Sequence, residues 1–210
     1  MSSKISADKY LGLLIDAIKL FYINDADSLF GADKNVDERA MVGCIYRYMW
    51  CKIVREGINC DIDIEYDRMR GRNGGLVKKS IDLAQECGTE NCRKECLKLI
   101  AKRAGKRKGK SDKELYSIRP DIILHMRNSE PGKDNYLVAE FKKAPVSSAD
   151  DKFDHAKIRW NTCSRSLLRY DYGVVVKLFQ KYAHLEQCDC DGKFVKVGYV
   201  DKDKLSRELL

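Results

Sequence analysis

The chain has 210 residues, of which 44% are hydrophobic and 34% charged, and its formal net charge is +8. This length fits one domain with a substantial core, and the composition is typical of a globular protein. No run of about 18 apolar residues predicts a membrane span, and the start lacks the uninterrupted apolar core of a signal peptide. We therefore expect one cytoplasmic domain over residues 1–210, with no membrane partner.

Two helices are predicted before the first strand. Residues 5–22 place apolar side chains at steps of three and four, and residues 36–55 repeat this pattern after a polar loop. Asn35 is a suitable N-cap for the second helix. Glu38, three residues later, completes the pattern of a capping box.

A strand and a long insertion are predicted next. Residues 60–68 alternate between acidic and apolar side chains without interruption, which is typical of a half-exposed strand. After a Gly-rich turn, residues 76–104 favour a helix that runs into a stretch rich in Gly and Lys. We therefore expect a helical, basic insertion over residues 69–118 within the domain.

The positive charge is concentrated in this insertion. Residues 93–119 hold eleven Lys or Arg and three Asp or Glu, a net charge of +8, whereas the rest of the chain sums to zero. Such a block suits a polyanion, because the cations neutralise phosphates and release counterions. A solvated loop tuned for solubility is the alternative. The residues expected to contact nucleic acid are Lys102, Arg103, Lys106, Arg107, Lys108 and Lys110.

Nine cysteines are many for a chain of this length. Their odd number and the missing secretory signal argue against a disulfide framework. Two groups stand out, namely Cys87, Cys92 and Cys96, and the pair Cys188 and Cys190. Neither group has the paired C-x-x-C spacing that strongly predicts zinc. We therefore expect reduced, mostly buried thiols, with a structural metal site as the alternative.

Two strands joined by a hairpin, residues 119–127 and 135–142, carry charge where a buried strand should have none. Side chains alternate along a strand, so Glu140 and Lys142 share one face. If the pairing turns Asp121 to that face, two carboxylates and an ammonium converge. Close carboxylates raise each other's pKa unless a cation lies between them.

Oxygen ligands of this kind suit Mg²⁺ or Mn²⁺, which bind phosphates and activate water. Lys142 would orient that water, help remove its proton, or hold the scissile phosphate. The alternative is an ion pair between Glu140 and Lys142 at the end of a strand, with Asp121 as a turn residue. E-x-K alone is a weak signal, and the Pro-Asp dipeptide before the first strand strengthens it.

The last third of the chain predicts a helix and two more strands. Ser147 or Ser148 opens a helix over residues 148–169. Residues 172–179 and 193–200 favour strands, followed by a short C-terminal helix. The order of elements predicts a mixed α/β domain around one sheet.

This arrangement resembles the PD-(D/E)xK nuclease superfamily, which has the restriction-endonuclease-like fold. The resemblance rests on the Pro-Asp that ends at Asp121 and, after eighteen intervening residues, on Glu-Phe-Lys at residues 140–142. The expected elements of residues 36–180 also match the family's αβββαβ core. The resemblance implies a central mixed sheet flanked by helices, and hydrolysis of nucleic acid, with DNA ahead of RNA. Many members act as homodimers.

The resemblance also assigns roles to residues. Asp121 and Glu140 would ligate Mg²⁺ or Mn²⁺, and the backbone carbonyl of Phe141 would be a further ligand. Lys142 would handle the attacking water. Many members add a glutamate from the first core helix, and Glu38 lies on the apolar face of that helix. The capping box is the alternative role for Glu38.

Weaker candidates flank this group. Lys143 points to the opposite face from Lys142, and it either contacts a phosphate or ends the strand. His125 is expected to be a structural histidine, and Glu65 to belong to a solvated face. Candidates for phosphate contacts on the following helix are His155, Lys157 and Arg159.

Three classes of function stay open. A Mg²⁺-dependent nuclease is the first, because the chain retains the whole D…E-x-K set. A catalytically inactive nucleic-acid-binding or interaction protein is the second, since fold alone does not fix function. An adaptor with a structural zinc site, built from the cysteine groups, is the third.

Overall fold

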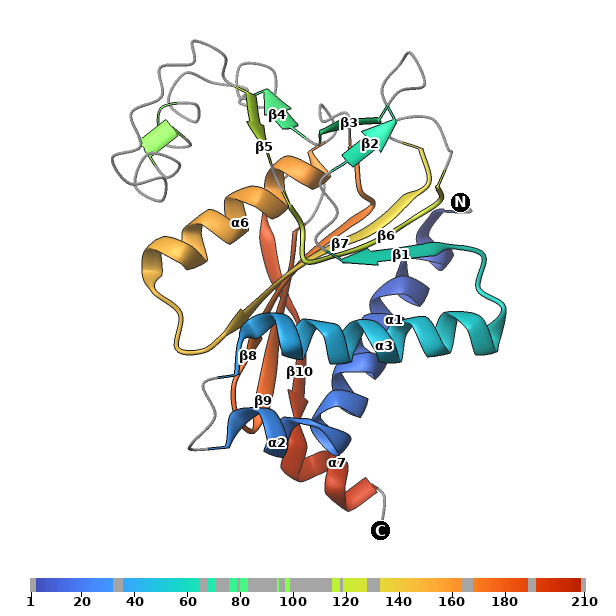
Figure 1. Cartoon of the computed structure of the whole chain (residues 1–210), viewed down its shortest axis with the longest axis vertical. Coiled ribbons are helices and arrows are strands. Elements are labelled where there is room, and N and C mark those ends of the chain that lie inside the picture. Colours follow the sequence, from blue (N-terminus) through green and yellow to red (C-terminus); the bar gives the residue numbers. More distant parts are fainter. Residues whose placement is uncertain are drawn as a thin grey trace.

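A computed structural model describes most of the chain (Figure 1). The described residues form an α/β fold with a six-stranded mixed sheet flanked by helices, as the sequence predicted. None of the described helices is long and apolar enough to cross a membrane. The described residues are 3–31, 36–64, 68–70, 76–78, 80–82, 94, 97–98, 115–117, 119–127, 133–163, 168–188 and 192–208.

The central sheet has the strand order β1-β6-β7-β8-β9-β10. Within it the β7–β8 pair is parallel and the other neighbours are antiparallel. Helix α6 connects the parallel pair, as a crossover must. The strands are β1 (Asp61–Ile64), β6 (Ile122–His125), β7 (Asn135–Lys143), β8 (Tyr172–Leu178), β9 (Tyr182–Cys188) and β10 (Phe194–Asp201).

Helices cover both faces of this sheet. α1 and α3 cross in front of it in Figure 1 and share one core cluster with it. α6 packs on the opposite face, where Ile158 and Trp160 join Ile123, Val138 and Val175 in a second cluster. The helices are α1 (Ser3–Asn24), α2 (Ala26–Phe30), α3 (Glu38–Glu56), α6 (Ser148–Thr162) and α7 (Lys202–Glu208).

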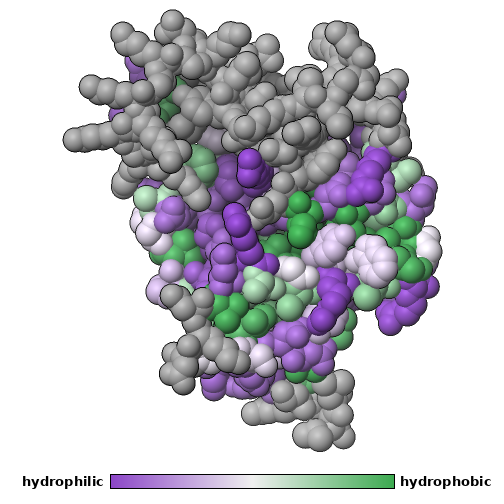
Figure 2. Space-filling view, in the orientation of Figure 1, coloured by the Kyte–Doolittle hydropathy of each residue, from purple (hydrophilic) through white to green (hydrophobic). Residues whose placement is uncertain are grey.

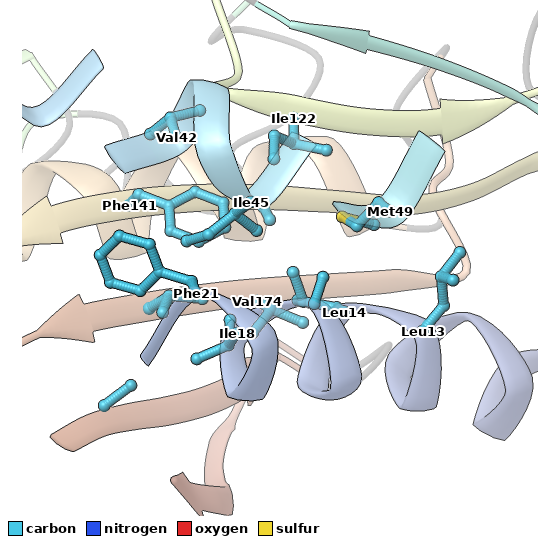
Figure 3. Packing of buried hydrophobic residues seen from close by; sticks show 14 of the residues in the cluster. Leu13, Leu14, Ile18, Phe21, Val42, Ile45, Met49, Ile122, Phe141 and Val174 are labelled. Carbon is cyan, nitrogen blue, oxygen red and sulfur yellow. The ribbon is translucent and has the colours of Figure 1, made fainter. Parts of the chain in front are cut away.

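The larger cluster holds α1 and α3 against the sheet. Their apolar side chains point towards one another and towards the strands (Figure 3). Leu14, Ile18 and Ile45 are 0% exposed, and full burial of such a side chain contributes about 1.5–3 kcal/mol. The outer face of these helices mixes hydrophilic and hydrophobic side chains (Figure 2). The N-terminal helix is therefore an integral layer of the fold.

α3 begins later than the sequence analysis expected. Asp37 is its N-cap, and the Asp37 carboxylate accepts a hydrogen bond from the Arg39 backbone N–H at 3.4 Å. Glu38 is the first helical residue, so it is too early to be the third residue of a capping box. The predicted N-cap at Asn35 is therefore wrong, and Asn35 itself lies outside the described residues.

The predicted helix over residues 76–104 is wrong at its start. β3 (Leu76–Lys78) pairs with β2 (Arg68–Arg70), and β4 (Ser80–Asp82) pairs with β5 (Leu115–Ser117). Leu97 lies in a described helical position, but most of this segment falls outside the described residues.

Three further differences lie in or next to the main fold. β9 was not predicted, because its half-buried positions carry His, Glu and Gln, which are weak strand formers. α2 occupies part of the predicted polar loop. The helix expected over residues 148–169 ends at Thr162, while its start is confirmed, since the Ser147 side chain accepts from the Asp150 N–H.

Candidate active site

The pairing of β6 with β7 decides where Asp121 lies. Ile122 pairs with Ala139, so Asp121 lies beside Glu140, one step further along the ladder. The Phe141 backbone N–H donates to Asp121 Oδ2 at 2.7 Å. The Asp121 carboxyl is therefore fixed to the strand that carries Glu140.

Glu38 joins this group from α3. Lys142 Nζ donates to Glu38 Oε1 at 2.8 Å and to the Phe141 carbonyl at 3.0 Å. Glu38 Oε2 accepts from the Lys143 backbone N–H at 2.9 Å. Both oxygens of Glu38 thus bind the end of β7. The late start of α3 makes this possible, because a capping box would turn the carboxylate to its own helix.

α6 supplies Asp154 and Lys157 from the other side of the sheet. Lys157 Nζ donates to Glu140 Oε2, and it lies 3.3 Å from Asp154 Oδ1. Asp154 Oδ2 lies 3.6 Å from Lys142 Nζ. Asp154 is 0% exposed and Glu140 1% exposed. A buried carboxylate therefore stands between two ammonium groups, and one of these binds Glu140.

The sequence analysis missed Asp154 and placed Lys157 among phosphate contacts. One signal was present, because an Asp and a Lys three residues apart share one face of a helix. That face is buried, since it also carries the fully buried Ile158 and Asn161. Charged residues on the buried face of a helix need partners, and here the partners lie on β7.

Burial dominates the electrostatics of this group. Burial raises the pKa of Glu140. The charges of Asp121 and Asp154 raise it further, whereas the charge of Lys157 lowers it. Burial also raises the pKa of Asp121, although the hydrogen bond from the Phe141 N–H lowers it. Both carboxyls thus hold protons more tightly than they would in water.

Burial and the neighbouring carboxylates shift the pKa values of the two lysines in opposite directions, and the carboxylates have the larger effect. Burial lowers the pKa of Lys142, but Asp154 and Glu38 raise it above its usual value. Burial likewise lowers the pKa of Lys157, and Glu140 and Asp154 outweigh that effect. Both side chains are therefore ammonium groups that donate hydrogen bonds.

A pocket of about 240 Å³ opens beside the group. Its lining residues are Glu38, Arg39, Val42, Ile64 and Asp121. Glu38 and Asp121 thus reach the solvent, whereas Glu140 lies behind them. Arg39 adds a cation at the opening, where an anionic ligand would enter.

The donor atoms fit a divalent cation. Mg²⁺ commonly binds one or two protein carboxylates and completes its shell with water and substrate phosphate. Asp121 and Glu140 supply two carboxylates, and Glu140 Oε1 is buried without a hydrogen bond from any described residue. Among the described residues no group of three or more His, Cys, Asp and Glu is arranged to hold a metal ion. The fit is therefore to a two-carboxylate site.

Charge supports the same conclusion. Four carboxyls, those of Glu38, Asp121, Glu140 and Asp154, surround the ammonium groups of Lys142 and Lys157. Burial is the main cause of the raised pKa values of Asp121 and Glu140, and neighbouring carboxyls add to it. A divalent cation would supply the missing positive charge.

The remaining predicted residues have separate roles. Lys143 Nζ donates to the Val36 carbonyl at 3.2 Å. His125 is a structural histidine as expected, since its Nε2 lies 2.8 Å from Asp63 Oδ2. Glu65 lies outside the described residues. So do the six basic residues expected to contact nucleic acid, Lys102, Arg103, Lys106, Arg107, Lys108 and Lys110.

Two of the three candidates for phosphate contacts bind elsewhere in the protein. His155 Nε2 lies 2.8 Å from Glu186 Oε2. Arg159 Nε donates to the Gly192 carbonyl at 3.1 Å. The third, Lys157, belongs to the buried group with Glu140. The helix therefore contributes to the site through Lys157 and Asp154.

The described cysteines are thiols, as expected, but the expectation that they are mostly buried is wrong for them, because only Cys188 is buried. Five of them carry thiols rather than disulfides: Cys44, Cys51, Cys60, Cys163 and Cys188. Cys188 is buried in the cluster under α6. The other cysteines of the two groups singled out in the sequence, Cys87, Cys92, Cys96 and Cys190, lie outside the described residues.

No protein-family model, curated protein or solved structure matches this chain. The described core has the order α3-β1-β6-β7-α6-β8, which is the order expected for residues 36–180. The basis for a function is therefore this order of elements and the chemistry of the buried charged group.

Proposed function

We propose that this protein is a Mg²⁺-dependent nuclease of the PD-(D/E)xK type, with the restriction-endonuclease-like fold, and that it hydrolyses phosphodiester bonds of DNA. The observation that carries the proposal is the meeting of Asp121, Glu140 and Lys142 on neighbouring strands, with Glu38 bound to Lys142. Support comes from the αβββαβ order of the core, in which Asp121 directly precedes the second strand, and Glu140 and Lys142 lie on the third.

Each side chain then has a defined task. Asp121 and Glu140 would hold the cation, together with the Phe141 carbonyl, and the cation would supply Lewis-acid stabilisation of the reacting phosphate. Lys142 would donate hydrogen bonds to the attacking water or to a phosphate oxygen, where negative charge develops. Glu38 and Asp154 keep its ammonium in place. Lys157 offsets the charge of Glu140.

Cleavage of single- and double-stranded DNA, with Mg²⁺ or Mn²⁺ and with EDTA as the blank, tests this proposal. We expect Lys142→Met and Asp121→Asn to lower the cleavage rate by about 100-fold or more, as loss of one transition-state contact does. Lys152→Met is the matched control, since Lys152 is an exposed lysine on α6. Circular dichroism confirms that each variant is folded. Cleavage by both variants at the wild-type rate would refute the assignment.

A catalytically inactive nucleic-acid-binding protein is the second candidate. The observation that favours it is the bond from Lys157 to Glu140, which occupies a carboxylate oxygen with an ammonium group. In that case nucleic acid binds equally well with and without divalent cations, and no substrate is cleaved under any metal condition.

A further inference from the structure

Four aromatic side chains gather on the sheet face that α6 covers, beyond the end of that helix. We call Phe179, Tyr182, His184 and Tyr199 the aromatic platform. The Phe179 and Tyr182 rings stack with centroids 4.4 Å apart, and the Tyr182 and Tyr199 rings stack at 5.2 Å. The His184 ring lies 5.2 Å from Tyr199. Three segments, the end of β8, β9 and β10, thus present one connected aromatic surface.

The platform lies in register with the candidate active site. Lys142 pairs with Lys177 on β8, Lys177 pairs with His184, and His184 pairs with Tyr199. Paired residues of neighbouring strands point to the same face of a sheet. Three strand spacings separate Lys142 from Tyr199, a distance of about 14 Å. About four nucleotides at a stacked rise of roughly 3.4 Å would span it.

Tyr199 is the exposed residue of the platform, the other three are half-buried, and hydrogen bonds hold the platform in place from behind. Tyr199 is 45% exposed. On the opposite side of the turn, the Tyr22 hydroxyl lies 2.7 Å from the Phe179 carbonyl and also contacts the Tyr182 carbonyl. The Phe179 N–H donates to the same Tyr182 carbonyl at 2.8 Å. A surface that is already ordered loses little conformational entropy when a ligand binds.

Lys196 is the cation beside the platform that would attract an anionic ligand. Lys196 Nζ lies 5.6 Å from the centre of the Tyr199 ring, and Lys177 stands between the platform and Lys142. The nearby carboxylates are engaged within the protein. Asp151 and Glu186 both bind Lys177, at 2.8 Å and 3.4 Å. Asp201 accepts from backbone N–H groups at the start of α7. Aromatic faces with lysines beside them are the chemistry of single-strand binding sites.

Unpaired bases are the ligand that this surface fits. In a duplex the base faces are stacked on one another, whereas a single strand exposes them to aromatic side chains. We propose that the aromatic platform stacks the unpaired bases of a single-stranded nucleic acid whose backbone passes Lys177 and enters the site at Lys142. This inference rests on the proposed function and narrows its substrate to single strands or single-stranded ends.

Binding measured in EDTA tests the platform without cleavage. Fluorescence anisotropy would follow a labelled short oligothymidylate and a duplex of similar length. We expect Tyr199→Ala to weaken single-strand binding by roughly 5- to 150-fold, the loss of one stacked base, and to leave duplex binding unchanged. Tyr199→Phe keeps the ring and should bind within about 2-fold of the wild type. Val195→Ala is the control, since Val195 is 51% exposed on the same strand.

Abasic substitutions in the oligonucleotide separate stacking from a structural effect. Removing one base should weaken binding to the wild-type protein at one or two positions, and this loss should vanish in Tyr199→Ala. Equal single-strand affinity of Tyr199→Ala and wild type would overturn the platform, and so would an equal loss for duplex. Because these assays contain no metal, a protein that binds in this way and never cleaves would refute the nuclease and keep the platform.

Discussion

Glu140 is the residue whose surroundings most strongly constrain the site. It is 1% exposed, and the Lys157 ammonium is the hydrogen-bond partner of its Oε2. Removing one partner of a buried ion pair leaves an uncompensated charge, which costs far more than the pair itself contributes. The Glu140 carboxyl therefore matters both for the stability of the fold and for the proposed chemistry of the site.

We expect Lys157→Met to lower the free energy of unfolding by about 3–5 kcal/mol, because Glu140 is then buried without its cation. The double variant Glu140→Gln with Lys157→Met should recover most of that loss, since no charge is left alone. Urea unfolding followed by circular dichroism measures both. The exposed Lys152→Met should stay within about 0.5 kcal/mol of the wild type. An unfolding curve of Lys157→Met identical to that of the wild type would contradict the buried pair.

The sequence could predict part of this site and not the rest, for a physical reason. Period-two alternation along a strand puts Glu140 and Lys142 on one face, and the Pro-Asp dipeptide marked Asp121. Asp154 and Lys157 reach the site only through packing of α6 on β7, which no local pattern encodes. Glu38 depended on whether the helix was capped two residues earlier, a choice between neighbouring polar residues that propensity does not settle.

At the scale of elements, the close approach of α6 to β8 holds Lys157 over Glu140. Gly173 on β8 makes this approach possible. A Cβ atom at this position would lie 2.5 Å from both Ile158 Cγ2 and Thr162 Cγ2. Such contacts are far shorter than van der Waals distance, so a side chain here would push the helix away from the sheet. A glycine within a strand often marks a close contact of this kind.

Gly173→Ala should therefore lower the free energy of unfolding by about 1–3 kcal/mol. Gly43→Ala is the matched control in α3, where a Cβ would meet nothing within 4 Å. There alanine removes the flexibility of glycine from a helix and should stabilise the protein by about 0.5–1 kcal/mol. Thermal unfolding of the two variants measures the contrast. If both variants change the free energy of unfolding by the same sign and size, the close contact of α6 with Gly173 is contradicted.

The elements that the sequence predicted well are those with long, regular patterns. Apolar steps of three and four marked α1 and α3, and the apolar runs marked β6, β7 and β8. β9 was missed because its buried residues are only Ala183, Leu185 and Cys188, and the residues at its other positions are typical of a loop. That strand carries half of the aromatic platform. The sequence analysis therefore could not predict the aromatic platform, because it missed the strand that carries two of its four rings.

At the scale of the whole molecule, the charge and the chemistry lie in different segments. The net charge of +8 comes from residues 93–119, whereas the rest of the chain is neutral. The candidate site has an excess of carboxyls and would repel a polyanion by itself. The proposed nuclease would therefore need a separate source of attraction for its substrate. We propose that the basic segment would supply cations, and that the aromatic platform would supply contacts that are independent of charge.

The salt dependence of binding separates these two contributions. Each phosphate contact on a single strand changes the slope of log Kobs against log salt by about 0.7. Replacing Lys102, Arg103, Lys106, Arg107, Lys108 and Lys110 by Gln should therefore reduce the slope by up to about 4. Tyr199→Ala should weaken binding equally at every salt concentration, since stacking releases no counterions. Gln at the exposed Lys9, Arg47, Arg55, Lys133, Lys152 and Lys204 removes the same six charges and is the control for net charge. Anisotropy titrations over a salt series decide the matter, and an unchanged slope in the six-residue variant would exclude the basic segment from the interface.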